Sequence, residues 1–362
     1  MTPPAELLHH ALVQPETMAA LQPRDWNALI RAARSEMLLG SLAHAARGIQ
    51  VPAKVSALFA EASDGAAMNQ NAIRFEIERM EEALAGSGIP VLLMKGAAYM
   101  LADLPPLPGR QIGDLDVMVP AARLAKAEAL LKAHGWQSVK PRGGYDDQYY
   151  REWMHELPPL AHERRGNVID LHHNIMPRTA RLSPRPTRMF EHAVPVTSVL
   201  SVMGPEDMLL HAAAHLAYDG DFQGGARNLW DIDRLTRHFA SLPDFWTRVQ
   251  AVAHDQQLKA PLARALRLAA ELYGTPSPSS LRGRSDIVDL LALRKLRGLD
   301  EYGQRRTPIS DFLLFVRGHW LRMPPFMLAR HLTTKWRARR REARLEGRST
   351  NRSRRPPQAP VG

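Results

Sequence analysis

Two aspartates that stand one residue apart are the clearest chemical signal in the chain. They are Asp114 and Asp116, in the apolar segment "DLDVMV". In a strand, residues i and i+2 point to the same face, so these two carboxylates would lie side by side. Carboxylates held that close repel each other unless a proton or a cation lies between them. Mg²⁺ is the expected cation, with Mn²⁺ as the alternative, because hard divalent ions bind carboxylate oxygens together with substrate phosphates.

A third carboxylate usually completes a site of this type. Asp170 in "VIDLHH" is the best candidate, because Val168, Asp170 and His172 fall on one face of a predicted strand. Three carboxylates can hold two metal ions, which clamp the attacking and leaving oxygens of a phosphoryl transfer.

The Asp-x-Asp pattern occurs at two other places, where it is not expected to bind a metal. The Asp-Gly-Asp of residues 219–221 lies at a glycine-rich turn, and the Asp-Ile-Asp of residues 231–233 lies in a segment with helical spacing of apolar residues. On a helix, residues two apart diverge by about 200° and cannot share a metal ion. Only the pair at 114 and 116 combines a strand with a preceding Lys-Gly turn.

The elements that must position these side chains alternate between strand and helix. The apolar run "IPVLLMKG" predicts a strand buried on both faces, and "AAYMLAD" predicts a short helix after it. The segment "AARLAKAEALLKAHG" follows the Asp-x-Asp strand and predicts a helix that ends at Gly135. The segments "WMHELPPLAHE" and "NVIDLHHNI" predict a β-hairpin around "RRG". This order is typical of an α/β unit, so we predict an α+β fold with helical flanks.

Four regions are expected along the 362 residues. They are an N-terminal helical region at 1–87, a mixed core at 88–200, a C-terminal helical domain at 201–333 and a basic tail at 334–362. Within the third region, "SDFLLFVRGHWLRMPPFMLARHL" is expected to form a pair of helices packed on the core. The alternative for this segment is peripheral attachment to a membrane, aided by the tail.

Composition excludes several classes of protein. The absence of cysteine excludes disulfides, thiolate zinc sites, iron–sulfur clusters and cysteine nucleophiles. The N-terminus lacks a secretory signal pattern, and no apolar run approaches the roughly 20 residues that span a bilayer. We therefore expect a cytoplasmic protein without a transmembrane segment, with peripheral membrane contact as the alternative. Motifs of P-loops, dinucleotide sites and nucleophile elbows are absent as well.

The net charge of +11 is concentrated near the C-terminus. Residues 335–355 contain ten basic and two acidic side chains, so they carry +8 and leave +3 for the rest of the chain. A broad basic face for nucleic acid on the globular part is therefore not indicated. The tail is expected to be solvated, and contact with an anionic membrane surface or with RNA is the alternative.

Five segments together resemble the bacterial group called nucleotidyltransferase family proteins, which are relatives of the polymerase-β-like nucleotidyltransferase superfamily. The segments are "LLMKGAAYML", "GRQIGDLDVMV", "VIDLHHNI", "EDMLLHAAAHL" and "LWDIDRL", and they span about residues 88 to 240. The superfamily pattern is an apolar strand ending in Gly-Gly or Gly-Ser, a short helix, an acidic Asp-x-Asp strand and a third acid on a later strand. Here Lys95-Gly96-Ala97 replaces the glycine pair, and 17 residues separate Gly96 from Asp114.

The resemblance implies a polymerase-β-like core and Mg²⁺-dependent transfer of a nucleoside monophosphate from a nucleoside triphosphate (NTP). The acceptor would be a hydroxyl or phosphate on a small molecule, a protein or RNA. Asp114, Asp116 and Asp170 would hold Mg²⁺, as the matching positions of the superfamily pattern imply. Gly96 would let the backbone approach the triphosphate, and Lys95 and Arg110 would contact the phosphates. A catalytically silent binding or assembly subunit, and an RNA-directed, toxin-like nucleotidyltransferase, are the rival hypotheses.

Several of these residues also have structural interpretations. Lys95 is either a phosphate ligand or the solvated end of a strand, and the Lys-Gly context favours the first. Arg110 either orients a phosphate or pairs with Asp114. His172 and His173 cannot both face the cleft, and His172 is the better candidate to touch substrate or orient a ligand.

A second polar group lies on one predicted helix. Asp207, His211 and His215 recur every four residues and so share a helix face. A metal pair is conceivable, but the third ligand of a zinc protease is missing, so a buried polar seam that links this helix to the sheet is favoured. Asp231 is expected to pair with one of these histidines or with Arg227.

Overall fold

The computed structural model describes residues 2–141, 143–218, 222, 224–324, 326–328 and 330 of the chain. The Asp-Gly-Asp of residues 219–221 and the basic tail lie outside the described residues. The expected contacts of the tail with lipid or RNA therefore stay predictions.

A single mixed sheet of seven strands, in the order β3-β4-β5-β2-β1-β7-β6, forms the centre of the α+β part. Its strands are β1 (Val91–Leu93), β2 (Leu115–Met118), β3 (Trp136–Ser138), β4 (Leu160–His162), β5 (Val168–His172), β6 (Val194–Pro195) and β7 (Leu200–Val202). The strand, helix and hairpin predicted from the apolar runs are β1, α5 (Lys95–Leu101) and the antiparallel pair β4 and β5. The predicted α+β fold class is thus confirmed.

The pairing of β2 explains how distant acidic residues meet. β2 runs antiparallel to β1 on one side and parallel to β5 on the other, and Asp116 lies opposite Asp170 in the parallel pair. Because β1 and β2 are antiparallel, the end of β1 and the start of β2 lie at the same edge of the sheet. Lys95, Asp114, Asp116 and Asp170 therefore gather at one place.

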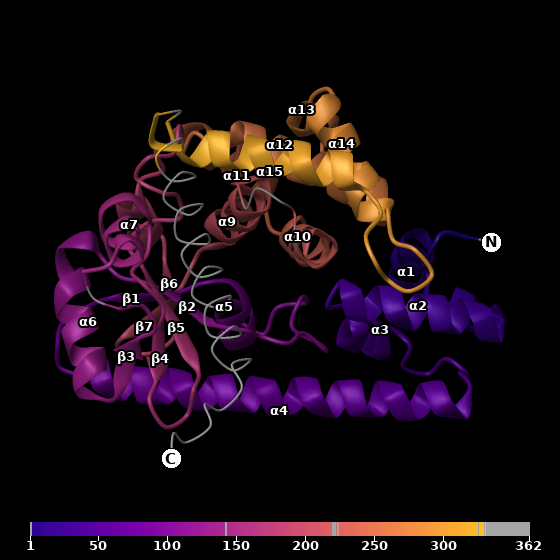
Figure 1. Ribbon diagram of the computed structural model, residues 1–362, viewed down its shortest axis with the longest axis horizontal. Coiled ribbons are helices and arrows are strands. Elements are labelled where there is room, and N and C mark those ends of the chain that lie inside the picture. Colours follow the sequence, from indigo (N-terminus) through magenta and orange to yellow (C-terminus); the bar gives the residue numbers. More distant parts are fainter. Residues whose placement is uncertain are drawn as a thin grey trace, which may run out of the picture.

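Helices cover the sheet and extend far beyond it (Figure 1). Before the sheet come α1 (Pro4–Val13), η1 (Pro15–Ala20), α2 (Pro23–Ser35), α3 (Leu39–Ala45) and α4 (Ala53–Leu84). Between the strands lie α5, η2 (Ala121–Arg123), α6 (Leu124–Ala133), α7 (Tyr145–Trp153) and α8 (Pro186–Glu191). After the sheet come α9 (Pro205–Tyr218), α10 (Gly225–Phe239), α11 (Phe245–Asp255), α12 (Lys259–Tyr273), α13 (Ser279–Arg282), α14 (Ile287–Arg297) and α15 (Pro308–Arg322).

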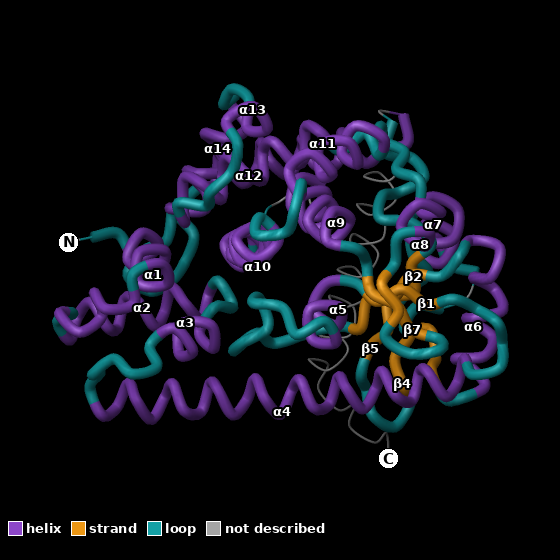
Figure 2. Tube along the Cα trace, turned by 180° about the vertical axis from the view of Figure 1, so that it is seen from behind, coloured by secondary structure: helices purple, strands orange, loops and turns teal. Residues whose placement is uncertain are grey.

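The long helix α4 ties the two ends of the molecule together. It runs from beneath α3 to the sheet, where it packs against α5, α6 and β2 (Figures 1 and 2). At the other end, α1 packs against α12 and α14, so the N-terminal and C-terminal helices contact each other. All described strands lie between Val91 and Val202, within or at the border of the predicted core, while the division into four regions stays a prediction.

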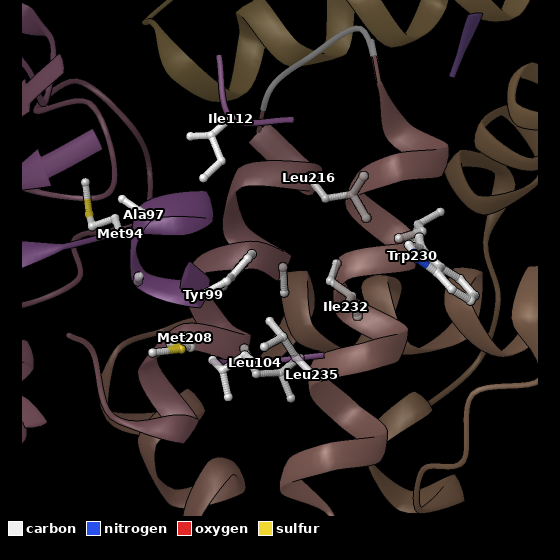
Figure 3. Close-up of a cluster of buried hydrophobic side chains, with 14 of the residues drawn as sticks. Met94, Ala97, Tyr99, Leu104, Ile112, Met208, Leu216, Trp230, Ile232 and Leu235 are labelled. Carbon is white, nitrogen blue, oxygen red and sulfur yellow. The ribbon is translucent and has the colours of Figure 1, made fainter. Parts of the chain in front are cut away.

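A buried apolar cluster holds α5 against α9 and α10 (Figure 3). The cluster includes Met94, Ala97 and Tyr99 from the α5 side, Met208 of α9 and Leu235 of α10, and all five are at most 5% exposed. This packing brings the polar residues of α9 and α10 to the edge of the sheet where Lys95 lies.

The sequence did not predict β3, α7 or the β6–β7 pair. β3 and β7 have three residues each and β6 has two, too short for a recognisable alternation of apolar and polar residues. The sequence of α7, "YDDQYYREW", has aromatic and charged residues in place of an apolar stripe, and only Asp147 is buried in it. These elements depend on neighbours that the local pattern does not reveal.

The apolar segment near the C-terminus forms α15, which packs on α9 and α14. Leu314 is fully buried, but Ile309 and Phe312 on the same helix are 68% and 65% exposed. The predicted packing on the core therefore holds for one side of α15 only. No helix within the described residues has both the length and the apolar character needed to cross a bilayer.

Candidate active site

Three carboxylates converge at the edge of the sheet where β2 begins. Asp114 precedes β2, Asp116 is its second residue, and Asp170 is the third residue of β5. One oxygen from each of the three lies within 4.8 Å of the others. The arrangement is the one that the sequence predicted, and it depends on the parallel register of β2 and β5.

Asp116 is the most tightly held of the three. Its Oδ1 accepts a hydrogen bond from Lys95 Nζ at 2.7 Å and lies 3.1 Å from His172 Nε2. Burial by itself would raise the pKa of Asp116, but Lys95 and His172 outweigh it and hold the pKa well below its usual range. Asp116 is therefore a carboxylate anion despite being 2% exposed.

The surroundings of Asp170 disfavour its charged form, in contrast to those of Asp116. Burial raises the pKa of Asp170 to about 7, and the carboxylates of Glu156, Asp116 and Asp114 add to the effect. Its Oδ1 is buried and has no hydrogen-bond partner among the described residues. An unpartnered buried carboxylate oxygen beside two other carboxylates fits a divalent cation with oxygen ligands, such as Mg²⁺ or Mn²⁺.

Lys95 is the first residue of α5, and its backbone is unusual. Its φ angle is +47°, in the left-handed region that side chains other than glycine rarely adopt. The ammonium group is directed to Asp116, and its side chain is 25% exposed. Lys95 is thus not the solvated end of a strand, whereas its contact with phosphates stays a prediction.

Arg110 pairs with Asp231 of α10 and not with Asp114. Its Nε lies 3.0 Å from Asp231 Oδ2, both side chains are buried, and the guanidinium lies over the ring of Tyr99 at 5.5 Å. The direct partner of Asp231 is thus Arg110, and not a histidine or Arg227 as expected, because the packing of α10 on α5 brings it to Arg110. Arg227 adds a second positive charge near Asp231.

The long helix α4 positions the loop that carries Arg110. Asn69 accepts a hydrogen bond from Ile112 N at 2.7 Å and donates one to Ile112 O at 3.0 Å. Gln70 donates to the carbonyl oxygens of Leu107 and Arg110 at 3.0 and 2.9 Å. Two neighbouring amide side chains thus hold the loop that leads into Asp114.

Gly96 has a packing role that its sequence context did not reveal. A Cβ atom at this position would overlap Arg110 Nη1 and lie 2.9 Å from Ile112 Cγ1. The absence of a side chain therefore makes room for the buried guanidinium. The predicted approach of a triphosphate to the Gly96 backbone stays a prediction.

Two cavities meet at the carboxylates. The first, of about 210 Å³, is called the cation-lined cavity, and its walls include Lys95, Gly96, Arg110, Asp114, Asp116 and Arg227. The second, of about 300 Å³, is called the histidine-lined cavity, and its walls include Tyr150, His155, Glu156, Asp170, His172 and His211. Lys95 and His215 line both cavities. The carboxylates therefore lie between a space lined by three cations and three aspartates, the third being Asp231, and a space lined by histidines and aromatic residues.

The histidines of α9 face the site as a neutral pair. Burial lowers the pKa of His211 to about 3 and that of His215 well below its usual value, and Lys95 adds to both shifts. Asp207, one turn before His211, lies near Arg188 and His192 instead, and burial raises its pKa to about 6. Three residues were predicted to form a buried polar link between this helix and the sheet. Of these, His211 and His215 reach the sheet and Asp207 does not.

Glu156 and His155 are site residues that sequence reasoning missed. Glu156 forms an isolated bridge with His172, and its Oε2 lies 3.4 Å from His172 Nδ1. His173 is directed away, with its Nε2 3.2 Å from Met154 O, as the alternation of a strand requires. The register of β4 and β5 would place Glu156 opposite His173, and the bridge to His172 is one residue out of that register, so counting back across the predicted hairpin would not have found this contact.

Comparison with protein families agrees with this geometry. The family model described as "Uncharacterised nucleotidyltransferase" matches residues 22–274, which is most of the chain. The protein is a transferase of the nucleotidyltransferase class, and the chain belongs to this family. The match extends on both sides of the segments that carried the resemblance, from the N-terminal helices to α12. Comparisons with curated proteins and with solved structures gave no match.

Proposed function

We propose that the protein transfers a nucleoside monophosphate from an NTP to a hydroxyl or phosphate acceptor. The convergence of Asp114, Asp116 and Asp170 beside the cation-lined cavity is the observation that carries this proposal. Three carboxylates in this position would hold one or two Mg²⁺ ions. When bound, Mg²⁺ would neutralise the triphosphate and polarise the phosphorus that is attacked.

The cation-lined cavity has the charge to bind the triphosphate. Lys95 and Arg227 both line it. The Nε of Arg227 is buried and finds no hydrogen-bond partner among the described residues, so this guanidinium has donor capacity for a phosphate oxygen. Arg110 is already held by Asp231 and adds positive charge to the wall.

The histidine-lined cavity is then the place for the acceptor. An acceptor oxygen bound there attacks the α-phosphorus, the bond from that phosphorus to the bridging oxygen breaks, and pyrophosphate leaves. Asp170 lines this cavity and takes the proton of an acceptor hydroxyl. The contribution of the protein is mostly positioning and charge compensation.

The test is NTP turnover by two variants of the carboxylate triad. Full-length protein is incubated with Mg²⁺, each NTP labelled at the α-phosphate, and a panel of small-molecule, protein and RNA acceptors. Asp114→Asn and Asp170→Asn should abolish labelled adducts and pyrophosphate release. Asp64→Asn, an exposed change on α4, is the matched control. Turnover that persists in either triad variant, or an absence of NTP binding in the wild-type protein, would contradict the proposal and favour a silent binding subunit.

A further inference from the structure

A second group of possible metal ligands lies beside the carboxylate triad and has no assigned role in the proposed transfer. It consists of His155 and Glu156, from the segment between α7 and β4, and His172 of β5. One ligand atom from each lies within 4.8 Å of the others. All three residues line the histidine-lined cavity.

His172 is oriented as metal-binding histidines are. Its Nε2 lies 3.1 Å from the Asp116 carboxylate, which places the ring proton on that nitrogen. Its Nδ1 is buried and has no hydrogen bond among the described residues, and it points to Glu156 Oε2 at 3.4 Å. A carboxylate that holds one ring nitrogen, while the other nitrogen makes no hydrogen bond, is the usual support of a metal-ligating histidine. The side chain is 3% exposed, so water does not readily take that position.

The spacing of the donor atoms fits a tetrahedral site. With metal–ligand distances of about 2.0–2.1 Å, two ligands of a tetrahedral Zn²⁺ lie about 3.3 Å apart. Here Glu156 Oε2 lies 3.4 Å from His172 Nδ1 and 3.8 Å from His155 Nε2. Small side-chain movements would therefore bring all three donors to one ion.

The ligand atoms of this group differ in chemical type from those of the carboxylate triad. Two imidazoles and one carboxylate suit zinc and related first-row ions, whereas three carboxylates suit Mg²⁺ or Mn²⁺. The imidazole ring of His172 separates the two groups, because one of its nitrogens faces Asp116 and the other faces Glu156. The four carboxylates of Asp114, Asp116, Asp170 and Glu156 also outnumber the nearby Lys95, so the surroundings favour a cation.

We propose that His155, Glu156 and His172 bind one divalent ion of the zinc class, at a site distinct from the carboxylate triad. Its remaining coordination position opens to the histidine-lined cavity, where water or a bound molecule would complete the tetrahedron. The site stands whether or not the protein transfers nucleotides.

Direct zinc binding tests this site without reference to activity. Full-length protein is stripped with a chelator and titrated with Zn²⁺ by calorimetry in excess Mg²⁺, and bound zinc is counted after desalting. The wild-type protein should bind one equivalent, and a Co²⁺ derivative should show the intense visible bands of tetrahedral coordination. His155→Ala and Glu156→Gln should each weaken Zn²⁺ binding by at least about tenfold. His134→Ala, which removes an exposed histidine after α6, is the matched control.

Other outcomes overturn the proposal. Wild-type protein that retains no more zinc than His155→Ala and Glu156→Gln would show that a proton, and not a metal, joins His172 to Glu156. Zinc binding that is lost in Asp114→Asn but kept in His155→Ala and Glu156→Gln would place the ion in the carboxylate triad. Circular dichroism of each variant confirms that the fold is retained, so that a loss of binding is not a loss of structure.

Discussion

The two Asp-x-Asp pairs within the described residues have the same sequence pattern and opposite physical roles. Asp114 and Asp116 lie at the start of a strand, where their carboxylates converge with Asp170. Asp231 and Asp233 lie on α10, where they point apart. Asp231 reaches Arg110, while Asp233 accepts hydrogen bonds from Arg237 and Thr275 at 2.8 and 2.7 Å. Because the strand carboxylates converge, they are suited to a cation. Because the helix carboxylates point apart, each forms its own structural ion pair.

The comparison also concerns stability. Asp116 is held by Lys95, whereas Asp170 lies among like charges, so Asp170 lowers the stability of the metal-free protein. The helix carboxylates are each matched by arginine, so they support the packing of α10 on its neighbours. We therefore expect enzymatic activity to depend on Asp114 and Asp116, and the stability of the fold to depend on Asp231 and Asp233. Four variants test this division.

The largest effect is expected for Asp116→Asn. It removes the central carboxylate of the triad and leaves Lys95 without its partner, so NTP turnover per folded molecule should fall by at least about 10²- to 10³-fold. Pyrophosphate release, normalised to the folded fraction, measures the loss. Asp233→Asn is the control in the same assay, and equal losses in both variants would remove the distinction between the two pairs.

Asp231→Asn should cause the greatest loss of stability. It leaves the buried guanidinium of Arg110 without a counter-charge, and breaking a buried pair in this way costs about 3–5 kcal/mol. Urea unfolding measures the change in the free energy of unfolding. The double variant Arg110→Met with Asp231→Leu should recover much of it, because no buried charge remains. A loss below about 1 kcal/mol in the single variant would show that the pair is not structural.

Asp233→Asn should destabilise the protein by a smaller amount, about 1–3 kcal/mol. Its side chain is fully buried, but Arg234 and Arg237 are 28% and 37% exposed and can turn to water when the charge is removed. Urea unfolding checks the value. Turnover per folded molecule should match that of the wild-type protein. A drop of tenfold or more would show that α10 contributes to catalysis and not only to stability.

An effect of opposite sign, a gain in stability, is expected for Asp170→Asn in the presence of a chelator. The pKa of Asp170 is about 7 in the folded protein and near 3.8 when unperturbed, so the folded state binds more protons than the unfolded state between these values. The free energy of unfolding of the wild-type protein therefore falls as pH rises from about 4 to about 7, and it levels off above that.

The variant lacks this contribution, so its advantage over the wild-type protein should grow from pH 4 to pH 7. Thermal or urea unfolding at several pH values measures the difference. Added Mg²⁺ should reduce it, since ligand binding stabilises only the protein that has the intact triad. A constant difference across this range of pH would show that Asp170 is not held among like charges.

Much of the carboxylate triad could be predicted because its signals are local. The alternation around Asp114 and Asp116 indicates a strand, and the segment around Asp170 indicates another, so only the pairing of these two strands had to be inferred. Glu156 could not be found by the same reasoning, because its bridge to His172 is one residue out of the register of β4 and β5. The contacts of Arg110 could not be predicted, because its partner Asp231 is 121 residues away in the sequence.

By itself, the sequence determined which aspartate pair can converge. A period of two places Asp114 and Asp116 on one face, and a period of 3.6 turns Asp231 and Asp233 apart, whatever surrounds them. Only the tertiary structure decided which cation meets which acid: Lys95 contacts Asp116, Arg110 is taken by Asp231, and Gly96 makes room for that guanidinium. The physical reason is that ion pairs between distant segments form where helices pack, and the packing of α5 on α10 depends on the whole buried cluster between them.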